Sequence, residues 1–341
     1  MSDPERAIPV ATEVEAGVSA AAGSPMAAAA PRPGFGSLLR FRLVVAGGWL
    51  LCRIPERLLL AAADLVGPAW WRLAPERRRR ATANLGRVTR WMAEHRVGSE
   101  RGQAAGRDPA ALDALVREAF RHLVRYNLIL ARASIIDARY IARWVSMDTP
   151  DVLASALGEP AGALFVGLHM GSFELPALYL ANITGRQAVA PTETLADPLL
   201  QAHVVRTRAQ LGLRLVELRS ARREMVAALR RGDPVGIVGD RDISGGGIEV
   251  PFFGAPAPLP AGPALLALET GVVPHVFGIH RDRAGVYHAN IVTVPFPAEG
   301  TRRERVTRYL ETEARAFEPL IAVAPEQWFA IFFPIWAEEA S

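Results

Sequence analysis

Residues 163–174 have the sequence Ala-Leu-Phe-Val-Gly-Leu-His-Met-Gly-Ser-Phe-Glu, in which an uncharged apolar run ends at a histidine and a glycine-containing turn. A short apolar run bounded by turn residues is typical of a buried strand. Further runs of this kind alternate with stretches that favour helices. The expected strands are 163–168, 187–190, 214–218, 234–238, 272–279 and 286–294, and the expected helices are 198–211, 220–231, 261–270 and 301–318. Such alternation predicts an α/β fold with a mostly parallel central sheet covered by helices.

The chain divides by composition into three parts. Residues 1–36 are rich in Ala, Pro and Gly without periodicity, which is typical of a disordered tail. Residues 37–150 favour helices that associate with a membrane, and residues 151–341 form the predicted α/β core. Ligands of such sheets bind at the carboxyl ends of the strands, so the polar loops after the strands are the candidate site.

Residues 37–71 are apolar but are interrupted by several charged residues. A helix that spans a membrane needs about 18 or more nearly continuous apolar residues, and this segment falls short. Two helices lying in the membrane interface, with Trp49, Trp70 and Trp71 at headgroup depth, fit the pattern. A pair of ordinary core helices and a single spanning helix are the alternatives.

The basic residues favour an anionic partner. The chain of 341 residues has a formal net charge of +4, a pI of about 9.8 and no lysine, so all 39 basic residues are arginine. Arginine binds phosphate through a fixed fork of donors. Because residues 77–80 are four arginines that follow the apolar segment, we expect contact with an anionic membrane surface. Nucleic acid is not expected, since aromatic residues are not interleaved with the arginines and no recognised nucleic-acid module is found.

The single cysteine, Cys52, excludes an intrachain disulfide and a cysteine-based metal site, and it suits a reducing compartment. Residues 1–6 do not have the basic region and adjoining apolar stretch of a secretory signal. We therefore expect the catalytic part at the cytoplasmic face of the plasma (inner) membrane, held peripherally or by an interfacial anchor.

His169 and Glu174 form a His-x4-Glu pattern after the first predicted strand. On a continuous helix, residues five apart lie about 140° apart, but Gly171 permits a turn and Pro176 favours a helix that begins nearby. Glu174 can then fold back onto the imidazole, fix its tautomer and make its other nitrogen a better base for a substrate hydroxyl. A structural histidine after a strand is the alternative.

A second polar loop, residues 240–254, follows the strand 234–238 and reads Asp-Arg-Asp-Ile-Ser-Gly-Gly-Gly-Ile-Glu-Val-Pro-Phe-Phe-Gly. Its glycines allow the backbone to approach a ligand closely, and their N–H groups suit an anion. Asp240 and Asp242 could also hold a divalent metal on a nucleotide-sugar, so a metal-dependent membrane-surface glycosyltransferase is the alternative function. A surface network with Arg241 is a further alternative, and a non-catalytic membrane-binding protein is a third functional hypothesis.

Arg206 and Arg208 lie in the predicted helix 198–211, where they could face the same cleft and pair with a donor phosphate or a thioester oxygen. No metal centre is expected. His275 and His280 are an odd number of residues apart along one strand, so their side chains point to opposite faces. A serine hydrolase is also not expected, because the chain has no Gly-x-Ser-x-Gly elbow.

In this order, these pieces resemble the bacterial lipid A biosynthesis (lauroyl/myristoyl) acyltransferase family, including its phosphatidylinositol mannoside acyltransferase branch. The likeness runs from Leu38 to Trp336. It rests on the Arg-rich helix that ends Asn84-Leu85, His169–Glu174, Asp197-Pro198-Leu199-Leu200 with its following arginines, the 240–254 loop, Pro260-Ala261-Gly262-Pro263-Ala264, Thr270-Gly271 and Pro325-Glu326-Gln327-Trp328.

The resemblance implies a glycerolipid acyltransferase-like α/β core with an N-terminal helical membrane anchor, which moves a fatty acyl chain onto a hydroxyl of a membrane glycolipid. Acyl-CoA or acyl carrier protein would be the donor co-substrate, with no metal. It implies that His169 is the general base, that Glu174 orients it, and that Glu249 lines the same pocket and assists. The substrate-binding residues implied in this way are Arg206 or Arg208 for the donor, Asp240, Arg241 and Asp242 around the site, and Phe252 and Phe253 beside the acyl groove.

The two branches leave the acceptor open. His-x4-Glu resembles the lipid A branch, whereas Asp-Arg-Asp followed by Gly-Ile-Glu-Val-x-Phe-Phe-Gly, and the closing Phe-Pro-Ile-Trp, resemble the mannoside branch. The expected acceptor is therefore a lipid A precursor, a phosphatidylinositol mannoside or another glycolipid.

Overall fold

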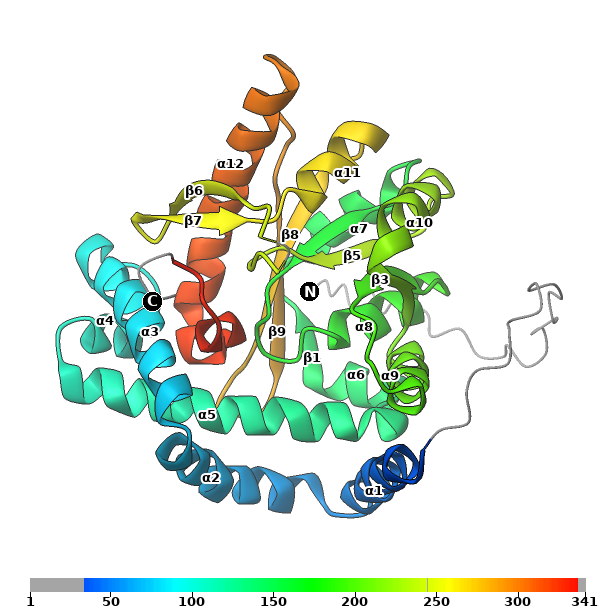
Figure 1. Ribbon diagram of the computed structural model, residues 1–341. Helices are drawn as coiled ribbons and strands as arrows, with labels where there is room; N and C mark the ends of the chain where they lie inside the picture. The colour runs from blue at the N-terminus through cyan, green and yellow to red at the C-terminus, as the bar shows by residue number, and fades with distance from the viewer. Residues whose placement is uncertain (1–33, 244, 337–341) are drawn as a thin grey trace, which may run out of the picture.

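The computed structural model describes residues 34–243 and 245–336 (Figure 1). Nearly all of the predicted tail, residues 1–36, lies outside these ranges. The described chain begins with helices, as predicted: α1 (Phe35–Leu51), α2 (Glu56–Leu73), α3 (Pro75–His95), α4 (Glu100–Ala105), α5 (Pro109–Ala131) and α6 (Ala138–Trp144).

A seven-stranded sheet forms the centre of the molecule, in the order β1-β9-β8-β2-β5-β3-β4. Neighbouring strands are parallel except for β8 and β9, which are antiparallel. The strands are β1 (Val145–Met147), β2 (Leu164–Gly167), β3 (Ala188–Thr192), β4 (Leu213–Glu217), β5 (Val235–Val238), β8 (Pro274–Arg281) and β9 (Tyr287–Thr293). The mostly parallel α/β fold predicted from the apolar runs is confirmed.

Helices cover both faces of this sheet. On one face α7 (Pro150–Gly158) and α8 (Leu175–Thr184) pack through buried residues such as Leu153 and Leu180 against Phe165 of β2. α9 (Pro198–Gln210) lies at the β4 edge. On the other face lie α10 (Leu218–Arg230), α11 (Gly262–Thr270) and α12 (Arg302–Val323). Because both faces are covered at the centre of the sheet, β2 is apolar and buried along its whole length.

Two strand regions differ from the prediction. The loop predicted at 240–254 ends in the first strand of an antiparallel hairpin, β6 (Ile248–Phe252), and β7 (Ala255–Leu259) follows the loop. Its connecting residues, Phe253 and Gly254, have φ values of +49° and +76°, as a two-residue hairpin turn requires. The short strand β1 lies in the part of the chain that was expected to be helical, and it pairs with β9.

Helices on both sides of residue 150 share one hydrophobic core. Leu85 of α3 and Phe120 of α5 belong to the same buried cluster as Leu164 of β2 and Phe317 of α12. The side chain of Asn84 lies in this core and donates hydrogen bonds to the carbonyl oxygens of Ile331 and Phe333. α3 therefore fixes the C-terminal segment against the sheet.

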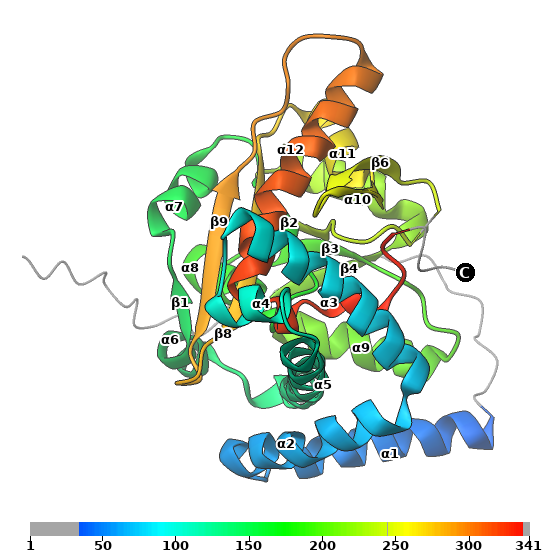
Figure 2. The same ribbon diagram turned by 90° about the vertical axis from the view of Figure 1, so that its left-hand side faces the viewer.

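α1 and α2 lie together on one side of the molecule, beyond α5 (Figures 1 and 2). α1 buries none of its residues, and large apolar side chains on both helices face outward, with Leu43 63% exposed and Leu65 78% exposed. No single helix in the described ranges is long and apolar enough to cross a membrane, but α1 and α2 pass that test as a pair bent by 120°.

Candidate active site

His169 and Asp240 meet because their strands are neighbours. β2 and β5 are parallel, with Gly167 opposite Val238, so the residues just beyond the two carboxyl ends lie side by side. The Nδ1 atom of His169 is 2.7 Å from Oδ1 of Asp240, and the backbone N–H of His169 donates to Oδ2 at 2.8 Å. The imidazole is 31% exposed, whereas the carboxylate is fully buried.

Three donors hold the Asp240 carboxylate. Besides the two from His169, the indole Nε1–H of Trp328 donates to Oδ2 at 2.7 Å. Burial alone would raise the pKa of Asp240, but the adjacent imidazole and these hydrogen bonds hold the pKa below its usual value. An ionised Asp240 accepts a hydrogen bond from Nδ1–H of His169 and so holds the tautomer in which Nε2 is the basic nitrogen. No hydrogen bond to Nε2 comes from any residue in the described ranges.

The turn that carries His169 is clamped by the C-terminal segment. Met170 forms a β-bridge with Trp328, the N–H of Phe329 donates to the carbonyl of His169 at 2.6 Å, and the N–H of Gly171 donates to the carbonyl of Gln327 at 3.0 Å. Gly171 has a φ of +57°, and a Cβ atom there would lie 2.3 Å from the carbonyl oxygen of Ile279. Only glycine therefore fits this turn.

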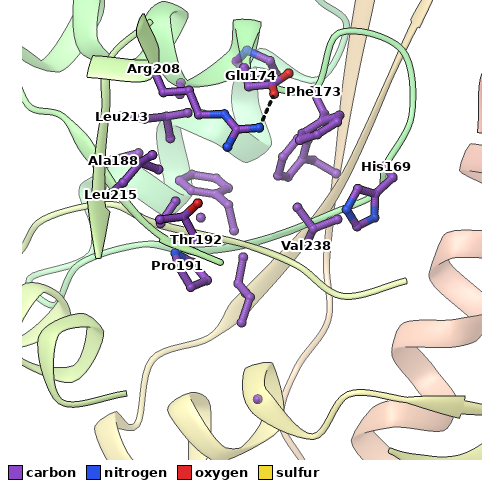
Figure 3. A pocket seen from close by; sticks show the side chains of 18 of the residues that line it. His169, Phe173, Glu174, Ala188, Pro191, Thr192, Arg208, Leu213, Leu215 and Val238 are labelled. Atoms are coloured by element: carbon purple, nitrogen blue, oxygen red, sulfur yellow. Dashed lines mark hydrogen bonds and ion pairs between the residues drawn. The ribbon is translucent and has the colours of Figure 1, made fainter. Parts of the chain in front are cut away.

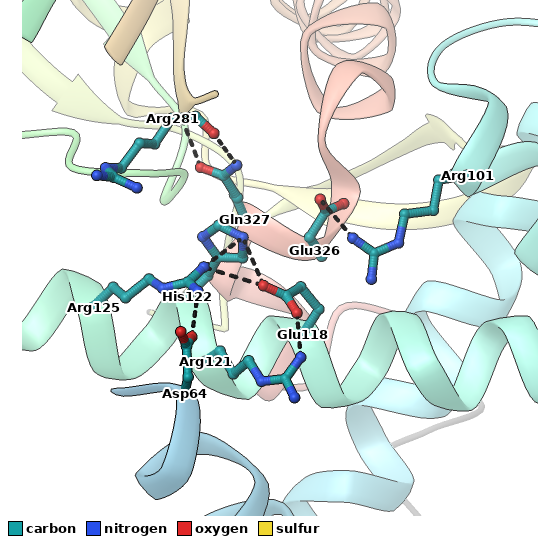
Figure 4. Close-up of polar contacts among 9 residues, drawn as sticks. All are labelled: Asp64, Arg101, Glu118, Arg121, His122, Arg125, Arg281, Glu326 and Gln327. Carbon is teal, nitrogen blue, oxygen red and sulfur yellow. Dashed lines mark hydrogen bonds and ion pairs between the residues drawn. The ribbon is translucent and has the colours of Figure 1, made fainter. Parts of the chain in front are cut away.

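The side chain of Gln327 fastens the same segment to β8. Its Oε1 accepts from the backbone N–H of Arg281, and its Nε2 donates to the carbonyl of Arg281, both at 2.8 Å (Figure 4). The neighbouring Glu326 faces Arg101 at 4.0 Å. The segment that carries Trp328 is therefore fixed to β8 through Gln327 and faces Arg101 of α4 through Glu326.

The expected hydrogen bond between Glu174 and His169 is not formed. Glu174 precedes α8, and its carboxylate accepts from the hydroxyl of Tyr126 at 2.8 Å and from Arg208 at 3.4 Å. Figure 3 shows this carboxylate turned toward Arg208. Burial raises the pKa of Glu174, while Arg208 and Tyr126 oppose that rise. The carboxylate that orients the imidazole is Asp240, and Glu174 instead positions an arginine.

The two predicted helical arginines have different environments. Arg208 lines the pocket beside His169, whereas Arg206 is exposed on α9 and does not line it. Arg241 also lines the pocket, and its guanidinium lies 3.9 Å from the ring centroid of Phe333. Two positive side chains therefore reach the cavity, one from α9 and one from the loop after β5.

Four residues of the 240–254 loop occupy places other than those expected. The carboxylate of Asp242 accepts from the N–H of Gly247 at 2.7 Å and so closes the glycine turn. Glu249 is exposed on β6 and does not line the pocket, because alternate residues of that strand face the core. Phe252 and Phe253 are 0% and 2% exposed and pack against tryptophans of the core, so neither borders the cavity.

The pocket beside His169 has a volume of about 920 Å³ and extends over one face of the sheet. Its lining is mostly apolar, with Phe165, Leu213 and Leu215 from the strands and Leu180 from α8. Figure 3 shows Arg208 and His169 among the few polar side chains at its wall. This size and lining are typical of a site for an apolar ligand with a polar end.

The metal-dependent alternative finds little support in this geometry. Both oxygens of Asp240 accept from protein donors, which a metal would have to displace. In the described part of the chain, no group of three or more His, Cys, Asp or Glu side chains is arranged to hold a metal ion.

Trp328 and Tyr126 are site residues to which the sequence assigned no role. Trp328 stood in the Pro-Glu-Gln-Trp motif of the resemblance, which marked its position without indicating a partner. Tyr126 lies within α5, where nothing local distinguishes it from a core aromatic residue.

Comparison with known proteins gives the family of this chain. The family model described as bacterial lipid A biosynthesis acyltransferase matches residues 37–333. A phosphatidylinositol mannoside acyltransferase of Mycolicibacterium smegmatis is 29% identical over 311 residues, which cover 87% of this chain and 91% of that protein. A protein of the same description from Mycobacterium tuberculosis is 29% identical over 224 residues, 62% of this chain and 70% of that protein.

The family match covers most of the chain and includes both strands that carry the His169–Asp240 pair. The resemblance found in the sequence is confirmed, and the protein is an acyl-transferring enzyme. The chain belongs to the bacterial lipid A biosynthesis acyltransferase family.

Proposed function

We propose that this enzyme transfers a fatty acyl chain from a thioester donor, acyl-CoA or acyl carrier protein, to a hydroxyl of a membrane glycolipid. The observation that carries the proposal is the buried Asp240 carboxylate on Nδ1 of His169, with the imidazole at the wall of an apolar pocket. A base without a neighbouring protein nucleophile suits direct attack by a substrate hydroxyl.

In the proposed step, the acceptor hydroxyl gives its proton to Nε2 of His169 while its oxygen attacks the thioester carbonyl carbon. The carbon–sulfur bond then breaks, and the thiolate takes the proton back from the imidazolium. The products are an ester and a thiol, and the enzyme is regenerated. Asp240 stabilises the imidazolium, because its carboxylate is already ionised and is in contact with Nδ1 of the ring.

The other pocket residues suit the donor. The apolar lining accommodates the acyl chain, and Arg208 and Arg241 place positive charge where a phosphate-bearing donor or the developing oxyanion can meet it. Tyr126 and Glu174 hold Arg208 in place. We assign Arg208, Arg241 and Asp240 to the site. Arg206, Glu249, Phe252 and Phe253 do not line the pocket.

The acceptor is proposed to be a glycolipid of the phosphatidylinositol mannoside kind. Both relatives described above are named for acylating that lipid class, and the sequence of the 240–254 loop resembles the mannoside branch of the family. The exposed apolar side chains of α1 and α2 support the proposal that the enzyme works at an anionic membrane surface that contains this lipid. We expect that surface to be the cytoplasmic face of the plasma membrane.

The test is an acyl-transfer assay with the full chain, hexadecanoyl-CoA and purified phosphatidylinositol mannosides, with a lipid A precursor as the second acceptor and products identified by mass spectrometry. His169→Ala should lower kcat about a hundredfold to ten-thousandfold, the usual contribution of a general base. His288→Ala is the matched control, because His288 pairs with Asp148 at the surface and lies outside the pocket. Full activity of His169→Ala would contradict the proposed base, and no transfer by the wild type to either acceptor would contradict the proposed reaction.

A further inference from the structure

The floor of the pocket is one face of the sheet. Phe165 of β2 lies opposite Gly236 of β5, and Ala190 of β3 lies opposite Leu215 of β4. The pairing of Val189 with Val235 places Ala190 beside Gly236 in the same row. All four of these floor residues line the cavity. The row therefore has two small residues at its centre and a large residue on each side.

Gly236 differs from the other glycines near these strands. A Cβ atom at Gly167 would lie 2.6 Å from the ring of Phe277, and one at Gly239 would lie 2.6 Å from Val166, so both are glycine because the packing is tight. A Cβ atom at Gly236 would meet nothing within 4 Å, and its φ is not positive. Neither packing nor backbone conformation requires glycine there.

A glycine in the middle of a central strand weakens the strand unless something approaches its backbone closely. The open space over Gly236 belongs to the pocket, so a ligand is the group that would approach. Because Gly236 precedes Asp240 by four residues, it lies about 13 Å from the reacting end along the strand. A chain whose carbonyl lies at His169 therefore passes over Gly236 only if the chain is long.

We propose that Gly236 determines the length of acyl chain that the enzyme accepts, by keeping the floor of the pocket open between Phe165 and Leu215. This proposal rests on the acyl-transfer function proposed above. A side chain at position 236 would project into the cavity and divide it. Donors with short chains would still reach His169, whereas long chains would lose the deeper part of the pocket.

The experiment compares Gly236→Ala, Gly236→Val and Gly236→Leu with the wild type, using octanoyl-, dodecanoyl- and hexadecanoyl-CoA. Binding is measured as the rise in Tm that each donor causes, and transfer is measured with phosphatidylinositol mannosides. Each methylene that no longer enters the pocket should weaken binding about fourfold. We expect the preference for hexadecanoyl-CoA over octanoyl-CoA to fall by about tenfold or more in Gly236→Leu, with smaller changes in the Val and Ala variants.

Gly158→Leu is the matched control. Gly158 is exposed at the end of α7, outside the pocket, and a Cβ atom there also meets nothing within 4 Å. It should leave the chain-length preference unchanged. The proposal would be overturned if the chain-length preference were unchanged in all three Gly236 variants. It would also be overturned if variants that keep the wild-type Tm lost binding of all three donors equally. Failure of the wild type to transfer any acyl chain would instead contradict the acyl-transfer function.

Discussion

The indole N–H of Trp328 is the donor to Asp240 that comes from outside the His169 turn. Replacing Trp328 with Phe removes this hydrogen bond and keeps an aromatic ring in the core. A hydrogen bond to a charged group contributes about 1.5–3 kcal/mol, so kcat should fall about tenfold to a hundredfold if the contact acts through the imidazole. The hydrogen bond also lowers the pKa of Asp240. Its loss raises that pKa, so the acid limb of the pH–rate profile should move to higher pH.

Trp336→Phe is the matched control for this residue. Trp336 is 2% exposed in the same core, and its indole N–H donates to the backbone carbonyl of Phe252 at 3.2 Å, away from Asp240. Both variants should lose stability through the smaller ring, which a Tm measurement reports. Only Trp328→Phe should shift the acid limb. Equal kinetic behaviour of the two variants would show that Trp328 acts through packing alone.

Single residues of the site were predictable where the argument was local. His169 could be placed at the site because it follows a buried strand, and ligands bind at strand ends. Its partner could not be placed in the same way. Reasoning along the chain favoured Glu174, five residues away, whereas Asp240 is 71 residues away and becomes adjacent only because β2 pairs with β5. Strand order is a property of the whole sheet that apolar runs do not encode.

Among the elements, α1 connects the outer apolar surface to the site. Its Ser37 hydroxyl donates to Asp197 at 2.7 Å, and Phe41 packs edge-on against His203, so α1 rests on the start of α9. α9 also carries Arg208, which lines the pocket. A membrane surface that receives α1 and α2 would therefore lie next to the helix that carries this arginine.

Charged substitutions on these helices should weaken membrane binding without unfolding the core. Leu43 and Leu65 are exposed, so Leu43→Glu and Leu65→Glu remove apolar area from a membrane contact and add negative charge. We expect at least about a tenfold loss of co-sedimentation with anionic phospholipid vesicles, with an unchanged Tm. Ile183→Glu is the control, since Ile183 is 53% exposed on α8, away from both helices. An equal effect of all three substitutions would exclude a specific membrane face on α1 and α2.

Elements were predictable from the sequence where burial is continuous. The runs that form β2 and β5 are apolar because both faces of the sheet are covered. The β6–β7 hairpin was not predicted, because Pro251, Pro256 and Pro258 disfavour strands and are tolerated only in an edge pair. β1 has three residues, which is too short for a pattern to show.

At the scale of the whole molecule, α12 lies between the sheet and the N-terminal helices and carries a fully buried acid, Glu313. A Cβ atom at Gly239 would lie 3.3 Å from its Oε1, so Glu313 lies directly behind the residue that precedes Asp240. Burial raises the pKa of Glu313 to about 8, the hydroxyl of Tyr309 opposes the rise, and the negative charge of Asp240 adds to it. The folded protein therefore keeps this side chain protonated at neutral pH.

This buried acid should make the fold less stable as the pH rises. Between the unfolded value of 4.5 and the folded value of about 8, the folded state binds the proton and the unfolded state releases it. The free energy of unfolding therefore falls by up to about 1.4 kcal/mol per pH unit from this group. Glu313→Gln removes that loss, so its advantage over the wild type in urea unfolding should grow from pH 5 to pH 8. Glu304 on the same helix is the opposite case, because its hydrogen bonds to Thr301 lower its pKa. Glu304→Gln should be less stable than the wild type at pH 7, with a deficit that shrinks toward acid pH. A Glu313→Gln advantage that does not change with pH would show that residue 313 is already ionised in the fold.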